Sequence, residues 1–143
     1  MHGIVKDMTE HSTFSWPIRV YWEDTDAGGV VYYANYLKFL ERARTEWLSA
    51  LGLEQDRLAD EHGVVFVVRR VEADFLRPAR FNDRLTVVCE LAELGRASLV
   101  MRQHIRRGDE RLFAALVRVA CVGWQTFRPA RIPTFVTEAF PTP

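Results

Sequence analysis

The spacing of apolar residues changes period between residues 23 and 36, and this change constrains the fold more than any other feature. Before it, apolar and polar residues alternate over Pro17–Glu23, which predicts a half-buried strand. After it, apolar residues recur every three or four positions and predict the buried stripe of a helix. That stripe comprises Tyr36, Leu40, Ala43, Trp47 and Leu51, and Gly52 is suited to end the helix. A helix of this length spans about 25 Å at about 1.5 Å per residue, so we expect it to run through the middle of the domain.

The rest of the chain contains strand-like segments separated by turn residues. They cover residues 64–78, 85–94, 97–106 and 111–124. Consecutive strands joined by tight turns pair as an antiparallel sheet, and one helix beside such a sheet gives an α+β domain. We predict this domain for residues 16–128, between a flexible N-terminal tail (1–15) and a loose, proline-containing C-terminal tail (129–143).

Composition narrows the class of protein. The 143 residues are 48% apolar, and 19 basic residues balance 19 acidic ones, so no general positive field attracts nucleic acid. The longest apolar run, Leu112–Val117, is far too short to span a membrane, and no secretory signal is evident. Cys89 and Cys121 lie in strand-like segments and are predicted to be buried, reduced thiols. Together these features favour a soluble cytoplasmic protein.

Metal binding is not predicted. Cys89 and Cys121 have no neighbour at metal-ligand spacing, and His62 and His104 are isolated from each other and from other ligands. We therefore expect no bound metal.

The acidic turn before the long helix combines groups suited to acyl transfer. Asp24 and Asp26 precede Gly28 and Gly29, a pair that lets the backbone reverse or approach a ligand closely. The first amides of a helix have no intrahelical partner, so they can bind a developing oxyanion beside a carboxylate. A structural interpretation stays open, in which the aspartates are turn residues and Asp24 or Asn35 caps the helix.

The residues of this turn and helix resemble a known signature. The stretch YWEDTDAGGVVYYANY (residues 21–36), followed by FLERAR (39–44), is similar to the 4-hydroxybenzoyl-CoA thioesterase family. It is especially similar to the bacterial Tol–Pal-associated acyl-CoA thioesterases. The order of the later strands agrees, so the resemblance covers roughly Pro17–Phe127.

This resemblance implies a hotdog fold, in which an antiparallel sheet wraps one long central helix. It implies homodimers, often paired into homotetramers, that hydrolyse acyl-CoA without a cofactor. Asp26 would be the catalytic carboxylate, and the backbone N–H of Tyr33 would bind the thioester oxygen. The sequence leaves open whether Asp26 attacks directly or activates water. It also leaves open the preferred acyl chain and the oligomeric state.

The chain departs from the family pattern at one position, and the resemblance also suggests further contacts with the substrate and with the CoA nucleotide. Tol–Pal-type members carry His where Tyr33 stands, whereas Tyr is typical of the hydroxybenzoyl-CoA branch, so the acyl preference stays open. Tyr32 and Gly28 are predicted to line the substrate site, and the aromatic ring of Tyr36 belongs either to the pocket or to the core. Arg96 and Ser98 resemble the position where family members meet the CoA nucleotide, and a guanidinium suits phosphate.

The sequence leaves other catalytic residues and other functions open. Hotdog thioesterases of another type use a carboxylate on the helix, for which Glu41 and Glu46 are the candidates. A non-catalytic module that binds acyl-CoA or acyl carrier protein would keep the pocket without needing Asp26. A hotdog hydratase is disfavoured, because that chemistry resembles an Asp with a His five residues later, where this chain has Val31.

Overall fold

The computed structural model describes residues 13–143. Five strands and four helical segments follow one another in the order β1, η1, α2, α3, β2, β3, β4, β5, α4. The strands are β1 (Thr13–Arg19), β2 (Val64–Phe75), β3 (Arg84–Leu94), β4 (Ser98–Arg107) and β5 (Glu110–Gly123). The helical segments are η1 (Trp22–Asp24), α2 (Asn35–Ala50), α3 (Gln55–His62) and α4 (Thr134–Ala139).

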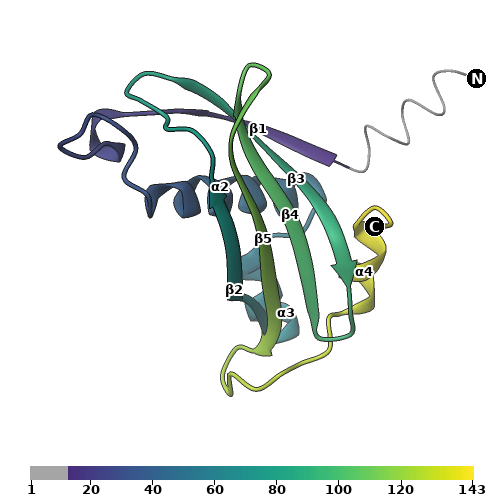
Figure 1. Ribbon diagram of the computed structural model, residues 1–143. Coiled ribbons are helices and arrows are strands. Elements are labelled where there is room, and N and C mark those ends of the chain that lie inside the picture. The colour runs from purple at the N-terminus through teal and green to yellow at the C-terminus, as the bar shows by residue number, and fades with distance from the viewer. Residues whose placement is uncertain (1–12) are drawn as a thin grey trace, which may run out of the picture.

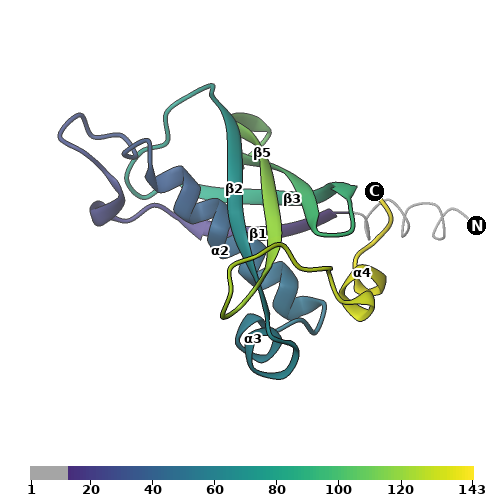
Figure 2. The same ribbon diagram turned by 90° about the horizontal axis from the view of Figure 1, so that it is seen from below.

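The five strands form one sheet in the order β1-β3-β4-β5-β2, and every neighbouring pair is antiparallel. Helix α2 crosses one face of this sheet (Figures 1 and 2). Its buried residues Phe39, Leu40 and Ala43 join the same core as Val87 of β3 and Phe113 of β5. The α+β architecture and the long helix across the sheet, both predicted from hydrophobic spacing, are confirmed.

The pairing of the strands differs from the prediction in one respect. The hairpins β3–β4 and β4–β5 form as expected, but β2 pairs with β5 rather than with β3. The connection from β2 to β3 is correspondingly long, over residues 76–83. Strand β2 therefore lies at one edge of the sheet, and its exposed apolar residues include Val68, Val71 and Phe75.

The ends of the domain also differ from the prediction. The first strand begins at Thr13, not at Pro17, and ends at Arg19, because the chain then turns into η1. Trp22, which the alternation over Pro17–Glu23 assigned to the strand, lies in η1 instead and is 70% exposed. At the other end, the expected loose tail contains α4, whose Val136 is fully buried and is followed by the buried Phe140. The predicted flexibility of residues 1–12 lies outside the described residues.

Candidate active site

The acidic turn forms a small closed loop between η1 and α2. Thr25 and Val31 pair as an antiparallel bridge, and the Asp26 N–H donates to the Val30 carbonyl at 2.9 Å. The Gly29 N–H returns a bond to the Asp26 carbonyl at 3.0 Å, and Gly29 adopts a φ of 78°, which a glycine tolerates without strain. The loop extends from the sheet beside the beginning of α2 (Figure 1).

Asp26 is exposed on this loop, and one of its oxygens is held. The Gly28 N–H donates to Asp26 Oδ1 at 2.8 Å, which fixes the orientation of the carboxylate. The second oxygen, Oδ2, accepts no hydrogen bond from residues 13–143. The carboxylate is therefore both oriented and accessible. The backbone amide of Gly28, which was predicted to line the substrate site, thus orients the Asp26 carboxylate.

Asp24 has a different environment, since it is only 5% exposed. Its Oδ2 accepts a hydrogen bond from the Tyr21 N–H at 2.8 Å. Its carbonyl accepts from the Tyr32 N–H and from Asn35 Nδ2, both at 2.9 Å. Asp24 is thus a structural residue of the turn. The hypothesis that Asn35 caps α2 is wrong: Ala34 occupies that position, and the Asn35 side chain is used to bind Asp24.

The backbone amide of Tyr33 lies just before α2, two residues ahead of Asn35. Within residues 13–143 this N–H has no backbone or side-chain acceptor, whereas the neighbouring Tyr32 and Asn35 amides are bonded. The Tyr33 side chain is 63% exposed and packs edge-on to Phe75, with ring centroids 6.3 Å apart. A hydrogen bond with Tyr33 raises the pKa of Tyr32. Tyr36 is buried instead and stacks on Phe113, so its ring belongs to the core.

Residues 76–83, which we call the clasp segment, hold both ends of the Asp26 loop. Phe81 stacks on Trp22 before the loop, with ring centroids 4.1 Å apart. The Ala79 carbonyl accepts a hydrogen bond from the Val31 N–H at 2.8 Å after the loop. The Ala79 N–H in turn donates to the Tyr36 hydroxyl of α2 at 3.1 Å. The loop position is therefore set by a segment remote in sequence.

Arg107 at the end of β4 anchors the clasp segment. Its guanidinium donates to Asp83 Oδ2 and to Glu110 Oε1, each at 2.6 Å. Asp83 Oδ2 also accepts from the Arg80 N–H at 2.8 Å. These charge-assisted bonds connect the clasp segment to the β4–β5 hairpin, which is part of the central sheet.

Arg96 and Ser98 do not meet Asp26 within one chain. Ser98 pairs with Ala120, which pairs with Val67 near the start of β2. The Tyr33 ring instead contacts Phe75 at the end of β2. Eight residues separate these two levels of β2, or about 26 Å at about 3.3 Å per residue. The predicted nucleotide contacts and the predicted catalytic carboxylate therefore lie at opposite ends of the sheet.

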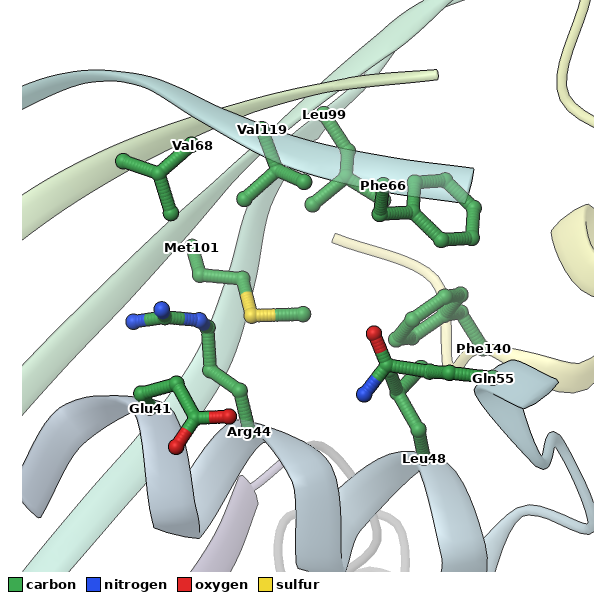
Figure 3. Close-up of a pocket in the computed structure, with 10 residues that line it drawn as sticks. All are labelled: Glu41, Arg44, Leu48, Gln55, Phe66, Val68, Leu99, Met101, Val119 and Phe140. Carbon is green, nitrogen blue, oxygen red and sulfur yellow. The ribbon is translucent and has the colours of Figure 1, made fainter. Parts of the chain in front are cut away.

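A cavity of about 140 Å³ lies between α2 and the sheet (Figure 3). Glu41 and Arg44 of α2 line it, and Glu46 does not. Most of its other lining residues are apolar: Leu48, Phe66, Val68, Leu99, Met101, Val119 and Phe140, together with the polar Gln55. Glu41 Oε1 accepts a hydrogen bond from the Thr45 hydroxyl at 3.1 Å. Of the two helix carboxylates considered from the sequence, only Glu41 thus lines this cavity.

A buried polar network adjoins this cavity. Gln103 of β4 is fully buried, and its Nε2 donates to the Leu40 carbonyl and to Cys89 Sγ, each at 3.1 Å. Arg44 Nη1 donates to Gln103 Oε1 at 3.0 Å. Burial raises the pKa of the Cys89 thiol to about 11 and lowers the pKa of the Arg44 guanidinium. Both predicted free cysteines are buried.

Two classes of site are not found in the part of the chain that the structure describes. No three His, Cys, Asp or Glu side chains there converge as a metal site requires. In residues 13–143, no helix is both long and apolar enough to cross a membrane.

Comparison with known proteins agrees with this geometry. An antiparallel sheet wrapped on one long helix is the hotdog fold, and 4-hydroxybenzoyl-CoA thioesterase bound to 4-hydroxybenzoyl-CoA shares it. The TM-score is 0.84 at 23% identity, covering 90% of this chain and 98% of that one. A sequence model of the thioesterase superfamily matches residues 28–114, and the chain belongs to this superfamily.

Two relatives are closer in sequence. The chain is 44% identical over 127 residues to the acyl-CoA thioesterase YbgC of Haemophilus influenzae, covering 89% of this chain and 93% of the relative. It is 38% identical to a probable thioesterase from Bartonella henselae, with a TM-score of 0.81 and coverage of 85% of this chain and 99% of that one. The resemblance inferred from residues 21–44 is confirmed, and the protein is a thioester hydrolase by class.

Sequence reasoning missed the clasp segment and the Arg44–Gln103 network. Residues 76–83 read as the end of a strand followed by a turn, and nothing in them indicates contact with Trp22 or Val31. Arg44 belongs to the recognised FLERAR stretch, but its partner Gln103 lies 59 residues away. The one signal was Gln103 itself, a polar residue that alternates with the apolar Met101 and Ile105 on one face of β4.

Proposed function

We propose that this protein hydrolyses acyl-CoA thioesters, with Asp26 as the catalytic carboxylate and the Tyr33 amide as the oxyanion donor. The observation that carries this is the orientation of Asp26 by the Gly28 N–H, on the loop that leads to the Tyr33 amide just before α2, which has no acceptor within residues 13–143. The similarity to the acyl-CoA thioesterase of Haemophilus influenzae supports the choice of substrate.

The chemistry follows from the groups present. As the thioester carbonyl is attacked, its oxygen becomes negative, and an amide at a helix start stabilises that charge. If Asp26 attacks, an acyl–aspartyl anhydride forms and CoA leaves as the thiolate, after which water cleaves the anhydride and regenerates the carboxylate. If Asp26 acts as a base, it takes a proton from the attacking water. One oxyanion donor is worth about 10²–10³ in kcat.

The complete site requires a second copy of the chain. In the part of the chain that the structure describes, strand β2 is an unpaired edge with exposed apolar residues, and a two-fold axis beside it would pair two β2 strands antiparallel. Antiparallel pairing brings the Val64 end of one strand beside the Phe75 end of the other. Arg96 and Ser98 of the partner would then lie at the end of the sheet that carries Asp26, where they suit the CoA phosphates. We therefore propose a homodimer, alone or paired into a tetramer.

The test of the catalytic proposal is release of free thiol from short, medium, long and aromatic acyl-CoAs by wild type and Asp26→Asn. Asp26→Asn keeps the shape and removes the charge, so we expect kcat to fall by about 10² or more. Asp60→Asn, an exposed carboxylate on α3, is the matched control and should behave as wild type. Equal activity of Asp26→Asn and wild type would refute the role of Asp26 and direct attention to Glu41. Binding without turnover would favour a non-catalytic module.

The dimeric site is tested with mixed oligomers. Chains carrying Asp26→Asn and chains carrying Arg96→Ala are co-expressed with different tags, and the mixed species is purified. If the two residues meet across the dimer, one site of each mixed dimer has both wild-type groups and recovers about half the activity. No recovery at low substrate concentration would show that the two residues do not share a site across subunits.

A further inference from the structure

Arg44 is a charged group in a mostly apolar cavity with little to neutralise it. Its guanidinium has five N–H donors, and within residues 13–143 one hydrogen bond is formed, to the neutral Gln103 Oε1 at 3.0 Å. Its nitrogen atoms lie within 4 Å of no carboxylate in the described part of the chain. Because an uncompensated charge is costly to bury, this arrangement favours binding of an anion.

The buried Gln103 side chain fixes the position of the Arg44 guanidinium. Gln103 is fully buried, and its amide nitrogen is held by the Leu40 carbonyl, so its oxygen is directed at Arg44. Figure 3 shows the Arg44 side chain rising from α2 toward Met101 and Val68 of the sheet, with Leu48 and Phe140 farther along the cavity. The Arg44 guanidinium thus lies at one end of a mostly apolar cavity.

Among residues 13–143, Glu41 is the one carboxylate that lines the same cavity. It is exposed, lies one turn before Arg44 on α2, and accepts a hydrogen bond from Thr45. Its charge partly offsets that of Arg44 and opposes an anionic ligand. Removing the Glu41 charge should therefore strengthen binding of an anion.

The size of the cavity restricts the ligand. About 140 Å³ is close to the 150 Å³ or so of an apolar cavity that holds one benzene molecule. We propose that this cavity binds a carboxylate on a short apolar body, such as a six-carbon or benzoate-sized acid, with Arg44 as its anchor. The carboxylate belongs either to a free acid or to the far end of the acyl chain of a dicarboxylic acyl-CoA. Binding of the acyl chain rests on the proposed function, whereas binding of a free acid does not.

The primary test is calorimetric binding of hexanoate, benzoate and the neutral analogue hexanamide. The proposal expects both acids to bind wild type at least tenfold more tightly than hexanamide, since an ionised partner strengthens the hydrogen bonds to guanidinium. Arg44→Met should remove this preference without weakening hexanamide, Arg44→Lys should retain part of it, and Glu41→Gln should tighten acid binding about two- to fivefold. Equal binding of acid and amide to wild type, or an acid preference that survives in Arg44→Met, overturns the proposal. If Arg44→Met does not fold, unchanged acid affinity in Glu41→Gln overturns it instead.

A second measurement distinguishes the two sources. The ratio of kcat/KM for adipyl-CoA to that for hexanoyl-CoA is compared in wild type and Arg44→Met. A fall of tenfold or more in this ratio identifies the acyl chain as the source, whereas an unchanged ratio with inhibition by hexanoate identifies the free acid. Absence of hydrolysis of every acyl-CoA in the thiol-release panel would refute the proposed function alone, because calorimetry reports on the cavity without turnover.

Discussion

Removal of one oxygen atom, by Tyr36→Phe, tests how α2 supports the Asp26 loop. The Tyr36 hydroxyl accepts the Ala79 N–H at 3.1 Å, and Ala79 is fully buried in the clasp segment. In the variant this amide loses its acceptor, while the aromatic ring keeps its stack on Phe113 at 5.0 Å between centroids. A buried donor left unsatisfied costs about 1–3 kcal/mol.

The expected loss in the free energy of unfolding is therefore about 2 kcal/mol, or roughly a 30-fold change in the equilibrium constant. For a chain of this size the melting temperature should fall by about 4–8 °C. The assay is urea unfolding at 25 °C and fixed protein concentration, with the m-value unchanged. Because the Ala79 carbonyl also holds Val31, kcat should fall as well.

Tyr21→Phe provides the control, since it deletes the same atom from an exposed side chain. It should change stability by no more than about 0.5 kcal/mol. If Tyr36→Phe lost no more stability than Tyr21→Phe, the Ala79–Tyr36 bond would contribute nothing and the argument for support of the clasp segment by α2 would be refuted.

Three further perturbations test other parts of the structure. Gly28→Ala places a Cβ 3.2 Å from Asp26 Oδ1, so kcat should fall at least tenfold with little change in stability; wild-type kcat would contradict the role of this close contact. Arg107→Met removes the bonds that anchor the clasp segment, so thioesterase activity should fall more than in Arg102→Met, whose ion pair lies elsewhere; equal effects would count against anchoring. Burial lowers the pKa of His104 in the folded protein, and the charges of Arg111 and Arg106 lower it further. As pH falls below about 6.5, the His104 imidazole therefore becomes protonated in the unfolded chain before it does so in the folded protein. Stability should therefore decline from pH 7 to 5.5, and His104→Gln should flatten that decline in melting temperature; an unchanged slope would show that His104 does not contribute.

Much of the fold could be predicted from local patterns. The 3.6-residue spacing of α2 and the alternation of β3 reflect which side chains must leave water, and this is encoded in neighbouring positions. The site signature was equally local, because the loop and the helix start that carry Asp26 and Tyr33 are contiguous in sequence. The end of the chain was misjudged, since prolines indicate a loop but do not reveal that Val136 and Phe140 find a buried surface.

The sequence by itself determined the class of this protein, because residues 21–44 predicted the fold and the family. The same residues led to the predictions for Asp26 and for the Tyr33 amide. The tertiary structure alone decided which distant segments meet. It placed β2 at the sheet edge, set the clasp segment against Trp22 and Val31, and joined Arg44 to Gln103. It also separated Arg96 from Asp26 within one chain. Such contacts depend on packing between surfaces far apart in sequence, for which hydrophobic spacing carries no signal.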